Sequence, residues 1–164
     1  MYYFDHYKDG TPSLFFDYKN HGPGEGGCTT EIRLRYRVSD KIPLTMLWAT
    51  RFVGRDGYYI QAEEQSQVLK RAYSTYIEFS YDIALPWSLT LSPTLGITPW
   101  RSLYTGFEGK FAVINTDLQL RRAWEISRHT DITAAAEIMI NPYNMAHKQS
   151  HSFNWNIAIG LQFK

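Results

Sequence analysis

Large apolar side chains occupy every second position along seven stretches of the chain. The last stretch, residues 153–163, shows the pattern most clearly, because Phe, Trp, Ile, Ile, Leu and Phe alternate there with polar or small residues. A period of two is typical of a β-strand with one apolar and one polar face, whereas a helix repeats about every 3.6 residues. The sequence therefore predicts strands over residues 31–38, 44–52, 73–83, 87–97, 112–122, 132–141 and 153–163, with residues 1–7 as a short opening strand.

The predicted connections alternate between long and short. The long ones cover residues 8–30, 53–72, 98–111 and 142–152, and the short ones cover residues 39–43, 84–86 and 123–131. Outer-membrane barrels have long extracellular loops and short periplasmic turns, and a tilted transmembrane strand needs about 9 to 11 residues. We therefore expect an all-β protein in which residues 1–164 form one domain, an antiparallel up-and-down (meander) transmembrane β-barrel or the C-terminal eight-strand part of one.

The two faces of the predicted strands differ in their chemistry. The apolar face is expected to contact outer-membrane lipid through Ile32, Leu34, Ile77, Phe79, Leu89, Leu91, Trp155, Ile157, Ile159 and Leu161. The polar face is expected to line a lumen through Glu31, Arg33, Arg35, Arg37, Arg51, Glu78, Asp117, Arg121 and Glu137. Alternation does not distinguish inside from outside, so a soluble lipocalin-like barrel that binds an apolar ligand is the alternative. The mid-strand charges and the rhythm of the connections favour the membrane barrel.

Three arginines, Arg33, Arg35 and Arg37, follow one another on the polar face of one predicted strand. Rings of arginine in a pore favour anions and phosphates, which predicts a porin or small-solute channel. The same arginines could instead pair with acidic residues of neighbouring strands and fill the interior of a small barrel. A purely structural membrane barrel is therefore a second interpretation of these arginines, in addition to the channel.

Composition excludes several classes of function. The net charge is +1, which provides no strong field to hold nucleic acid. Aromatic residues make up 16% of the chain against 20% charged, a balance that suits strands and membrane interfaces. No run approaches the roughly 20 apolar residues of a transmembrane helix, so a membrane-spanning form would be a barrel. Cys28 is the single cysteine and predicts neither an intrachain disulfide nor a cysteine-based metal site.

Residue patterns for catalysis and metal binding are weak. Ser127 and His129, with Glu125 or Asp131, have the side chains of a catalytic triad, but they fall in a predicted turn where such residues are common. His147 and His151 would share one face only in a helix, which is not expected between Asn-Pro and a strand. We therefore predict no enzymatic activity, no catalytic residues, no metal and no cofactor.

Four short segments resemble a known family. They are Tyr2-Tyr-Phe-Asp5, Phe16-Asp-Tyr-Lys-Asn-His21, Ala72-Tyr-Ser-Thr-Tyr-Ile-Glu-Phe-Ser-Tyr81 and Gly109-Lys-Phe-Ala-Val-Ile-Asn115. These aromatic strand signatures look like those of outer-membrane barrels from Bacteroidota-type bacteria, similar to the TorF-like porin family, over nearly the whole chain. The resemblance implies a barrel fold and an outer-membrane location. Family members have a signal peptide and further strands ahead of the first segment, so the resemblance also implies that this chain begins inside the natural protein.

Overall fold

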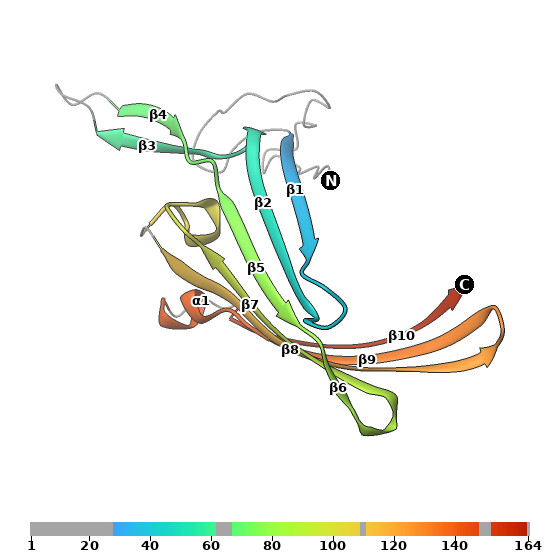
Figure 1. Ribbon diagram of the computed structural model, residues 1–164. Coiled ribbons are helices and arrows are strands. Elements are labelled where there is room, and N and C mark those ends of the chain that lie inside the picture. Colours follow the sequence, from blue (N-terminus) through green and yellow to red (C-terminus); the bar gives the residue numbers. More distant parts are fainter. Residues whose placement is uncertain (1–27, 62–66, 109–110, 148–151, 164) are drawn as a thin grey trace, which may run out of the picture. The chain divides into compact units, whose positions relative to one another are not determined.

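The computed structural model describes residues 28–61, 67–108, 111–147 and 152–163 (Figure 1). Strands predominate in it, and only one short α-helix, α1 (Pro142–Ala146), occurs in the described part. The strands are β1 (Thr29–Arg37), β2 (Leu44–Gly54), β3 (Gly57–Gln61), β4 (Gln67–Arg71), β5 (Thr75–Tyr81), β6 (Ile83–Leu85), β7 (Leu89–Thr98), β8 (Ala112–Ser127), β9 (Thr130–Ile140) and β10 (Phe153–Phe163). None of the described helices is long and apolar enough to cross a membrane. The predicted opening strand, residues 1–7, lies outside the described residues.

The main sheet follows the order of the chain. Its strands are hydrogen-bonded in the order β1-β2-β5-β7-β8-β9-β10, and β6 also pairs with β7. The prediction of an all-β fold built as an antiparallel up-and-down meander, the order of a barrel or of part of one, is confirmed. The chain divides into two compact units. Unit 1 consists of residues 1–34, 47–77 and 98–112, and unit 2 consists of residues 35–46, 78–97 and 113–164.

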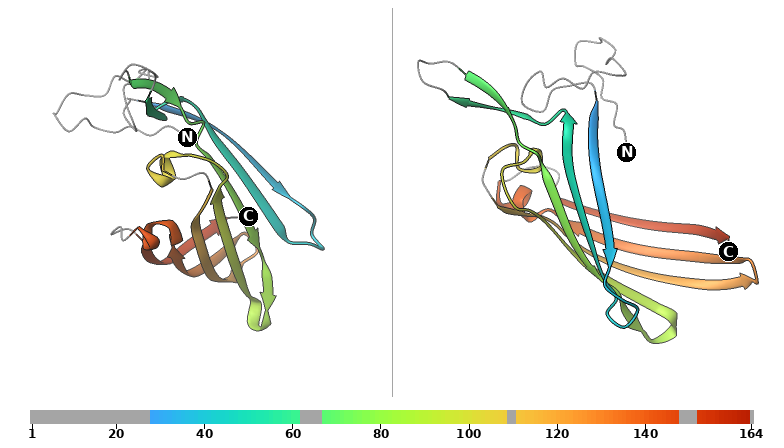
Figure 2. Two further views of the ribbon diagram at one scale, coloured as in Figure 1. Left: turned by 90° about the vertical axis from the view of Figure 1, so that its left-hand side faces the viewer. Right: turned by 45° about the horizontal axis from the view of Figure 1, so that its top comes forward.

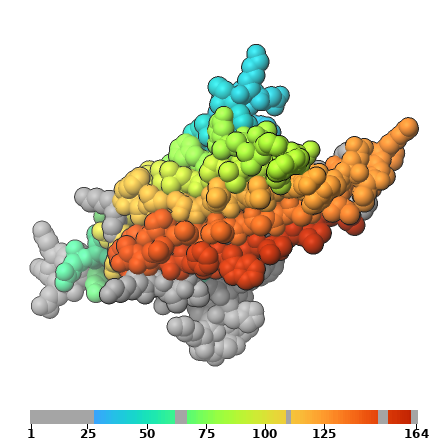
Figure 3. All heavy atoms as spheres, turned by 90° about the horizontal axis from the view of Figure 1, so that it is seen from below, coloured from blue at the N-terminus to red at the C-terminus, as the bar shows by residue number. Residues whose placement is uncertain are grey.

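In unit 2, the register of β8, β9 and β10 brings alternate residues of the three strands onto common faces. Ile138 of β9 lies opposite Leu118 of β8 and opposite Trp155 of β10. Figures 1 and 2 show the three strands side by side along their length, and Figure 3 shows their side chains, orange to red, as one continuous surface. The apolar members of this face are Leu118, Leu120, Trp124, Ile132, Ala134, Ala136, Ile138, Ile140, Phe153, Trp155, Ile157, Ile159 and Leu161.

The buried side chains of the described residues are mostly small and polar. The five buried apolar residues are Cys28, Ala49, Phe107, Ala112 and Ile114. The nine buried polar residues are Thr29, Thr50, Asp56, Ser74, Thr75, Ser92, Thr98, Ser102 and Thr105. Soluble domains bury Ile, Leu, Val and Phe and leave hydroxyl side chains mostly exposed. In the described part of this chain, most buried side chains are small and polar, and many large apolar side chains are exposed.

The connection predicted over residues 53–72 contains a second sheet, so the expectation of loop alone was wrong there. Strands β3 and β4 pair antiparallel, with Tyr59 opposite Leu69. Each of these strands has only five residues, and Tyr58, Tyr59 and Ile60 are three large side chains in a row. Such a short run without alternation gives no period-two signal.

Two predicted boundaries also shifted. The short connection expected at residues 84–86 is a 3₁₀ turn over Pro86–Ser88, because Ile83 and Leu85 pair with β7 as β6. Strand β8 extends to Ser127 and β9 begins at Thr130, so the connection expected over residues 123–131 is shorter than predicted.

Strand β2 ends at a glycine that no other residue could replace without strain. Gly54 has φ +88°, and a Cβ built on it would lie 1.6 Å from the backbone oxygen of Cys28. The Cys28 oxygen accepts a hydrogen bond from the Arg55 backbone N–H (3.2 Å), and the Gly54 oxygen accepts one from Arg71 Nη1 (3.1 Å). The end of β2 is therefore packed directly against the start of β1.

Substitution of this glycine should destabilise the chain more than substitution of a glycine in open space. Gly106 also has a positive φ (+58°), but nothing lies within 4 Å of a Cβ built on it. Gly106→Ala should therefore lower the free energy of unfolding by about 1 to 2 kcal/mol, the cost of the left-handed backbone alone. Gly54→Ala should cost clearly more, because the new methyl group also displaces the backbone of Cys28. Urea unfolding in detergent, followed by tryptophan fluorescence, measures both; equal losses would contradict the packing described.

Candidate functional site

The polar face of unit 2 collects three of the predicted lumen residues. Glu137 of β9 lies opposite Gln119 of β8 and Asn156 of β10, and Asp117 and Arg121 occupy the same face of β8 two residues to either side of Gln119. The backbone register alone determines this grouping, because residues two apart on a strand point to the same side. The register thus places these three residues on one face of the strands, and that this face lines a lumen stays a prediction.

An ion pair joins β8 to Asp82, the residue between β5 and β6. Arg121 Nη2 lies 3.0 Å from Asp82 Oδ2, and Ser92 Oγ donates a hydrogen bond of 2.6 Å to Asp82 Oδ1. Both charged side chains are partly exposed, and such pairs contribute about 0 to 1 kcal/mol. The ion pair thus orients Arg121 more than it stabilises the fold. Sequence analysis did not select Asp82, although it has the same parity as Glu78, because it stands next to a predicted strand end.

Two other carboxylates of this face, Glu137 and Asp117, are hydrogen-bonded. Asn156 Nδ2 donates to Glu137 Oε2 (3.3 Å), and Asn115 Nδ2 donates to Asp117 Oδ2 (3.3 Å). The Thr94 hydroxyl also donates to the carboxylate of Asp117. Charged groups on this face therefore belong to a network with their neighbours.

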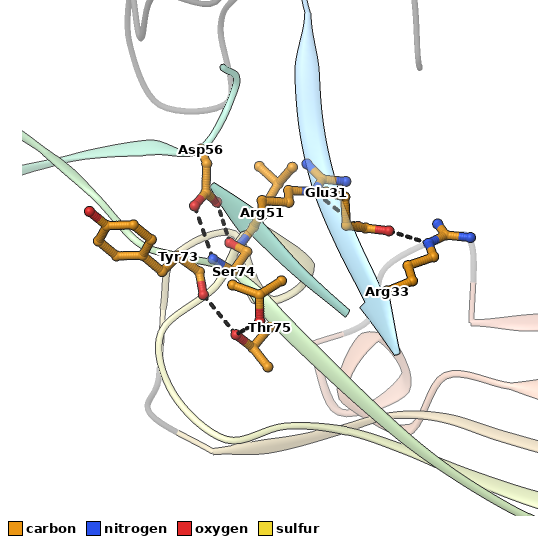
Figure 4. A network of polar contacts seen from close by, with 9 residues as sticks. Glu31, Arg33, Arg51, Asp56, Tyr73, Ser74 and Thr75 are labelled. Atoms are coloured by element: carbon orange, nitrogen blue, oxygen red, sulfur yellow. Dashed lines mark hydrogen bonds and ion pairs between the residues drawn. The ribbon is translucent and has the colours of Figure 1, made fainter. Parts of the chain in front are cut away.

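In unit 1, a nearly buried carboxylate lies between two guanidinium groups (Figure 4). The side chain of Glu31 is 4% exposed and forms an ion pair with Arg33, whose side chain is 44% exposed. Arg51, from β2, is 15% exposed and places its Nε 3.9 Å from Glu31 Oε2. Glu31 thus forms ion pairs with a guanidinium group of its own strand and with one of the neighbouring strand β2.

The three arginines of β1, Arg33, Arg35 and Arg37, differ in their contacts. Arg33 pairs with Glu31 on its own strand, whereas the structural interpretation expected pairs between neighbouring strands. Arg35 and Arg37 are exposed, and no acidic side chain of the described residues is within ion-pair distance of them. These two guanidinium groups are the ones on β1 that no described carboxylate neutralises.

A buried aspartate that the sequence did not single out holds the long connections of unit 1 together. Asp56 accepts hydrogen bonds from the backbone N–H of Ser74 (2.9 Å) and from the Ser74 hydroxyl (Figure 4). Ser74 Oγ in turn accepts a hydrogen bond of 2.7 Å from the backbone N–H of Leu103. Burial raises the pKa of Asp56, and the hydrogen bonds from Ser74 oppose that shift in part. Its only sequence signal is Asp-Gly, which indicates a turn.

Six of the ten apolar positions predicted to face lipid are exposed in the described part of the chain. Ile157 is 71% exposed and Ile159 is 80% exposed. The exposed members of the predicted set are Ile32, Leu34, Trp155, Ile157, Ile159 and Leu161. Its half-buried members are Ile77, Phe79, Leu89 and Leu91. Exposed apolar patches beyond a few hundred Å² are rare on soluble monomers and mark surfaces that contact lipid or protein.

The residues of the weak catalytic and metal-binding patterns form ordinary structural contacts. The backbone N–H of His129 donates to Ser127 Oγ (3.3 Å) within the turn between β8 and β9. A short helix, α1, does form in this connection, contrary to expectation, but it ends before His147. His147 stacks on Tyr143 and places its Nδ1 2.8 Å from the backbone carbonyl oxygen of Tyr143. His151 lies outside the described residues. Across the ranges that the structure describes, no group of three or more His, Cys, Asp or Glu side chains could hold a metal ion.

Comparison of the chain with protein-family models, curated proteins and solved structures finds no match. Its function must therefore be inferred from its own geometry.

Loss of the Ser74 hydroxyl should destabilise unit 1. Ser74→Ala removes a hydrogen-bond donor from the buried Asp56 and an acceptor from Leu103, and leaving such groups unpaired costs about 1 to 3 kcal/mol. The control is Ser39→Ala, which removes a hydrogen bond to Ile42 in an exposed turn and should cost less than about 0.5 kcal/mol. Urea unfolding in detergent measures both changes, and a loss at Ser74 no larger than at Ser39 would contradict the role assigned to Asp56.

The raised pKa of Asp56 predicts a pH dependence of stability. The folded chain binds the carboxyl proton of Asp56 more tightly than the unfolded chain does, in which the pKa of this group is near 3.8. The contribution of Asp56 to the free energy of unfolding is therefore largest below that pH and falls as pH rises through the folded pKa. Relative to Asp56→Asn, the wild-type chain should lose stability as pH is raised across this range. Unfolding of both chains at a series of pH values tests the sign, and a wild-type advantage that grows with pH would show the assignment to be wrong.

Proposed function

We propose that the chain is an outer-membrane β-barrel protein, or the C-terminal part of one, whose polar face lines a passage for small solutes. The observation that supports this proposal most strongly is the distribution of side chains in the described residues. Large apolar side chains such as Ile157 and Ile159 are exposed, whereas the buried side chains are mostly small and hydroxyl-bearing.

A bilayer changes the energetics of this distribution. In water, each Å² of exposed apolar surface costs about 25 cal/mol relative to burial. Against hydrocarbon the same surface carries no such cost, and barrels use alternate positions of each strand to meet lipid and lumen. The face of β10 that carries Trp155, Ile157 and Ile159 is suited to lipid contact for this reason.

A closed barrel would require strands beyond those described. The strand order ends at β1 and at β10, and an unpaired strand edge is costly in a bilayer. Seven strands that alternate in direction begin and end in the same direction. Antiparallel closure therefore needs an odd number of additional strands between β10 and β1. The proposed barrel takes them from outside the described residues.

Two alternatives differ from this proposal in specific ways. A soluble lipocalin-like barrel would line its cavity with Ile157 and Ile159, whereas in the membrane barrel these side chains contact lipid. A purely structural membrane barrel would neutralise its interior charges. Arg35 and Arg37, with no acidic partner among the described side chains, favour a water-filled passage.

A charge placed on the apolar face should prevent stable insertion, whereas the same charge on the polar face should not. Ile157→Arg should cost about 2 to 4 kcal/mol of stability in lipid vesicles. The matched control is Asn156→Arg, the adjacent residue on the opposite face, where the new guanidinium meets Glu137. Urea titration of the vesicle-inserted chains measures both. Equal effects, or a wild-type chain that stays monodisperse in buffer without detergent, would contradict the membrane barrel.

Neutralising Arg35 and Arg37, for which the described side chains provide no acidic partner, should weaken anion preference. In a planar bilayer, the full-length protein should conduct, and replacing Arg35 and Arg37 by Gln should shift the reversal potential in a KCl gradient toward cation permeation. The control replaces two cations in turns, Lys41 and Arg128, and should leave the reversal potential unchanged. A full-length protein that inserts without conducting would leave only the structural role.

A further inference from the structure

A charged residue, Arg122, lies on the apolar face of β8, β9 and β10 in unit 2. Arg122 is opposite Ala134 of β9, which is in turn opposite Ile159 of β10. The preceding residue, Arg121, points to the polar face and pairs with Asp82. Arg122 is the only charged residue that the register of these described strands brings to the apolar face. The side chains opposite it have no acceptor to offer its guanidinium group.

The guanidinium group of Arg122 contacts an aromatic residue of the same face. Its Cζ lies 5.0 Å from the centroid of the Trp124 ring, which is a cation–π distance. Trp124 lies two residues nearer the turn between β8 and β9, so this contact holds the guanidinium group toward that end of the strand. In the proposed barrel, this turn is at a membrane–water interface. Trp is enriched there, and arginine side chains near the end of a spanning segment extend toward the polar groups of that layer.

The described residues provide no acidic partner for Arg122. Its Nε is buried and has no hydrogen-bond partner among them, and no described carboxylate is within ion-pair distance of it. Toward the turn, the closest acidic residues are Glu125 and Asp131, which lie opposite each other on the polar face. Residues 148–151 and 164, the part of unit 2 outside the described ranges, contain no Asp or Glu. The counter-charge of Arg122 therefore comes from outside unit 2.

We propose that Arg122 and Trp124 bind the phosphate group of a membrane lipid at the end of the barrel that carries the β8–β9 turn. The inference rests on the proposed function, because this face must contact a bilayer. A charge on the lipid face is costly at the bilayer midplane and much less so near the interface. A guanidinium group presents parallel N–H donors to a phosphate, and the acyl chains of the same lipid lie along apolar side chains such as Ile159. The chemistry therefore fits a lipid better than a free anion.

Native mass spectrometry of the full chain in dodecyl maltoside, a detergent without phosphate, tests the lipid site during titration with dioleoylphosphatidylglycerol. Arg122→Gln should weaken binding of the first lipid about fivefold, the effect of one basic residue next to anionic lipid. Arg122→Lys should weaken it less, because the charge remains but the paired donors are lost. Trp124→Leu should weaken it about twofold through loss of the cation–π contact. The matched control, Arg121→Gln, removes the adjacent arginine from the opposite face and should bind the lipid as the wild-type chain does.

The outcomes separate the lipid site from the membrane barrel. Unchanged lipid affinity in Arg122→Gln, or an equal loss in Arg121→Gln, would contradict the site. Displacement of the lipid by an equal concentration of inorganic phosphate would also contradict it, because the acyl chains would then contribute nothing. If Ile157→Arg prevents insertion and Asn156→Arg does not, while Arg122→Gln leaves lipid affinity unchanged, the barrel stands and the site fails. If the chain is monodisperse without detergent and still binds the lipid through Arg122, the site stands and the barrel fails.

Discussion

The alternation of side chains between the two faces of the sheet is the constraint on which the rest of the structure depends. Because its period is two, a shift of one residue in the register would move every apolar side chain to the other face. The pairing of β9 with both β8 and β10 keeps the faces separate along the three strands, with Ile138 between Leu118 and Trp155. The exposed apolar surface and the polar network on the opposite face both follow from this register.

The interior chemistry of unit 1 is a consequence of the same constraint. Large apolar side chains that lie on the outer face cannot also form a core beneath the long connections. The described connections are held instead by hydroxyl, carboxylate and guanidinium groups, of which Asp56, Ser74 and the Thr50–Thr75 hydroxyl pair (2.7 Å) are buried. Polar contacts of this kind are directional, so they fix positions such as that of Leu103, whose backbone N–H donates to Ser74 Oγ, more precisely than apolar packing would.

The alternation of apolar and polar residues predicted the strands that show this pattern and missed the elements that lack it. The seven long strands and the common face of Asp117, Arg121 and Glu137 were predictable, because parity and register are both visible as a period of two. The hairpin of β3 and β4 is too short to show a period. The contact of Asp56 with Ser74 joins residues 18 positions apart through a turn, and no local pattern encodes it. The site around Glu31 and Arg51 was half predicted: both residues were assigned to the polar face, but the approach of the Tyr104 ring to Arg51, with Cζ 5.5 Å from the ring centroid, depends on how a long connection folds back.

The orientation of the apolar face toward lipid is the central claim, and spin-label accessibility tests it most directly. Nitroxide labels attached to single cysteines placed at positions 155 to 160, in a chain with Cys28→Ser, would be measured in lipid vesicles with oxygen and with a water-soluble nickel complex. The proposed barrel predicts that labels at 155, 157 and 159 collide mainly with oxygen, which partitions into lipid, and that labels at 156, 158 and 160 collide mainly with the nickel complex. The reverse alternation, or no alternation with a period of two, would contradict the claim that Trp155, Ile157 and Ile159 face lipid.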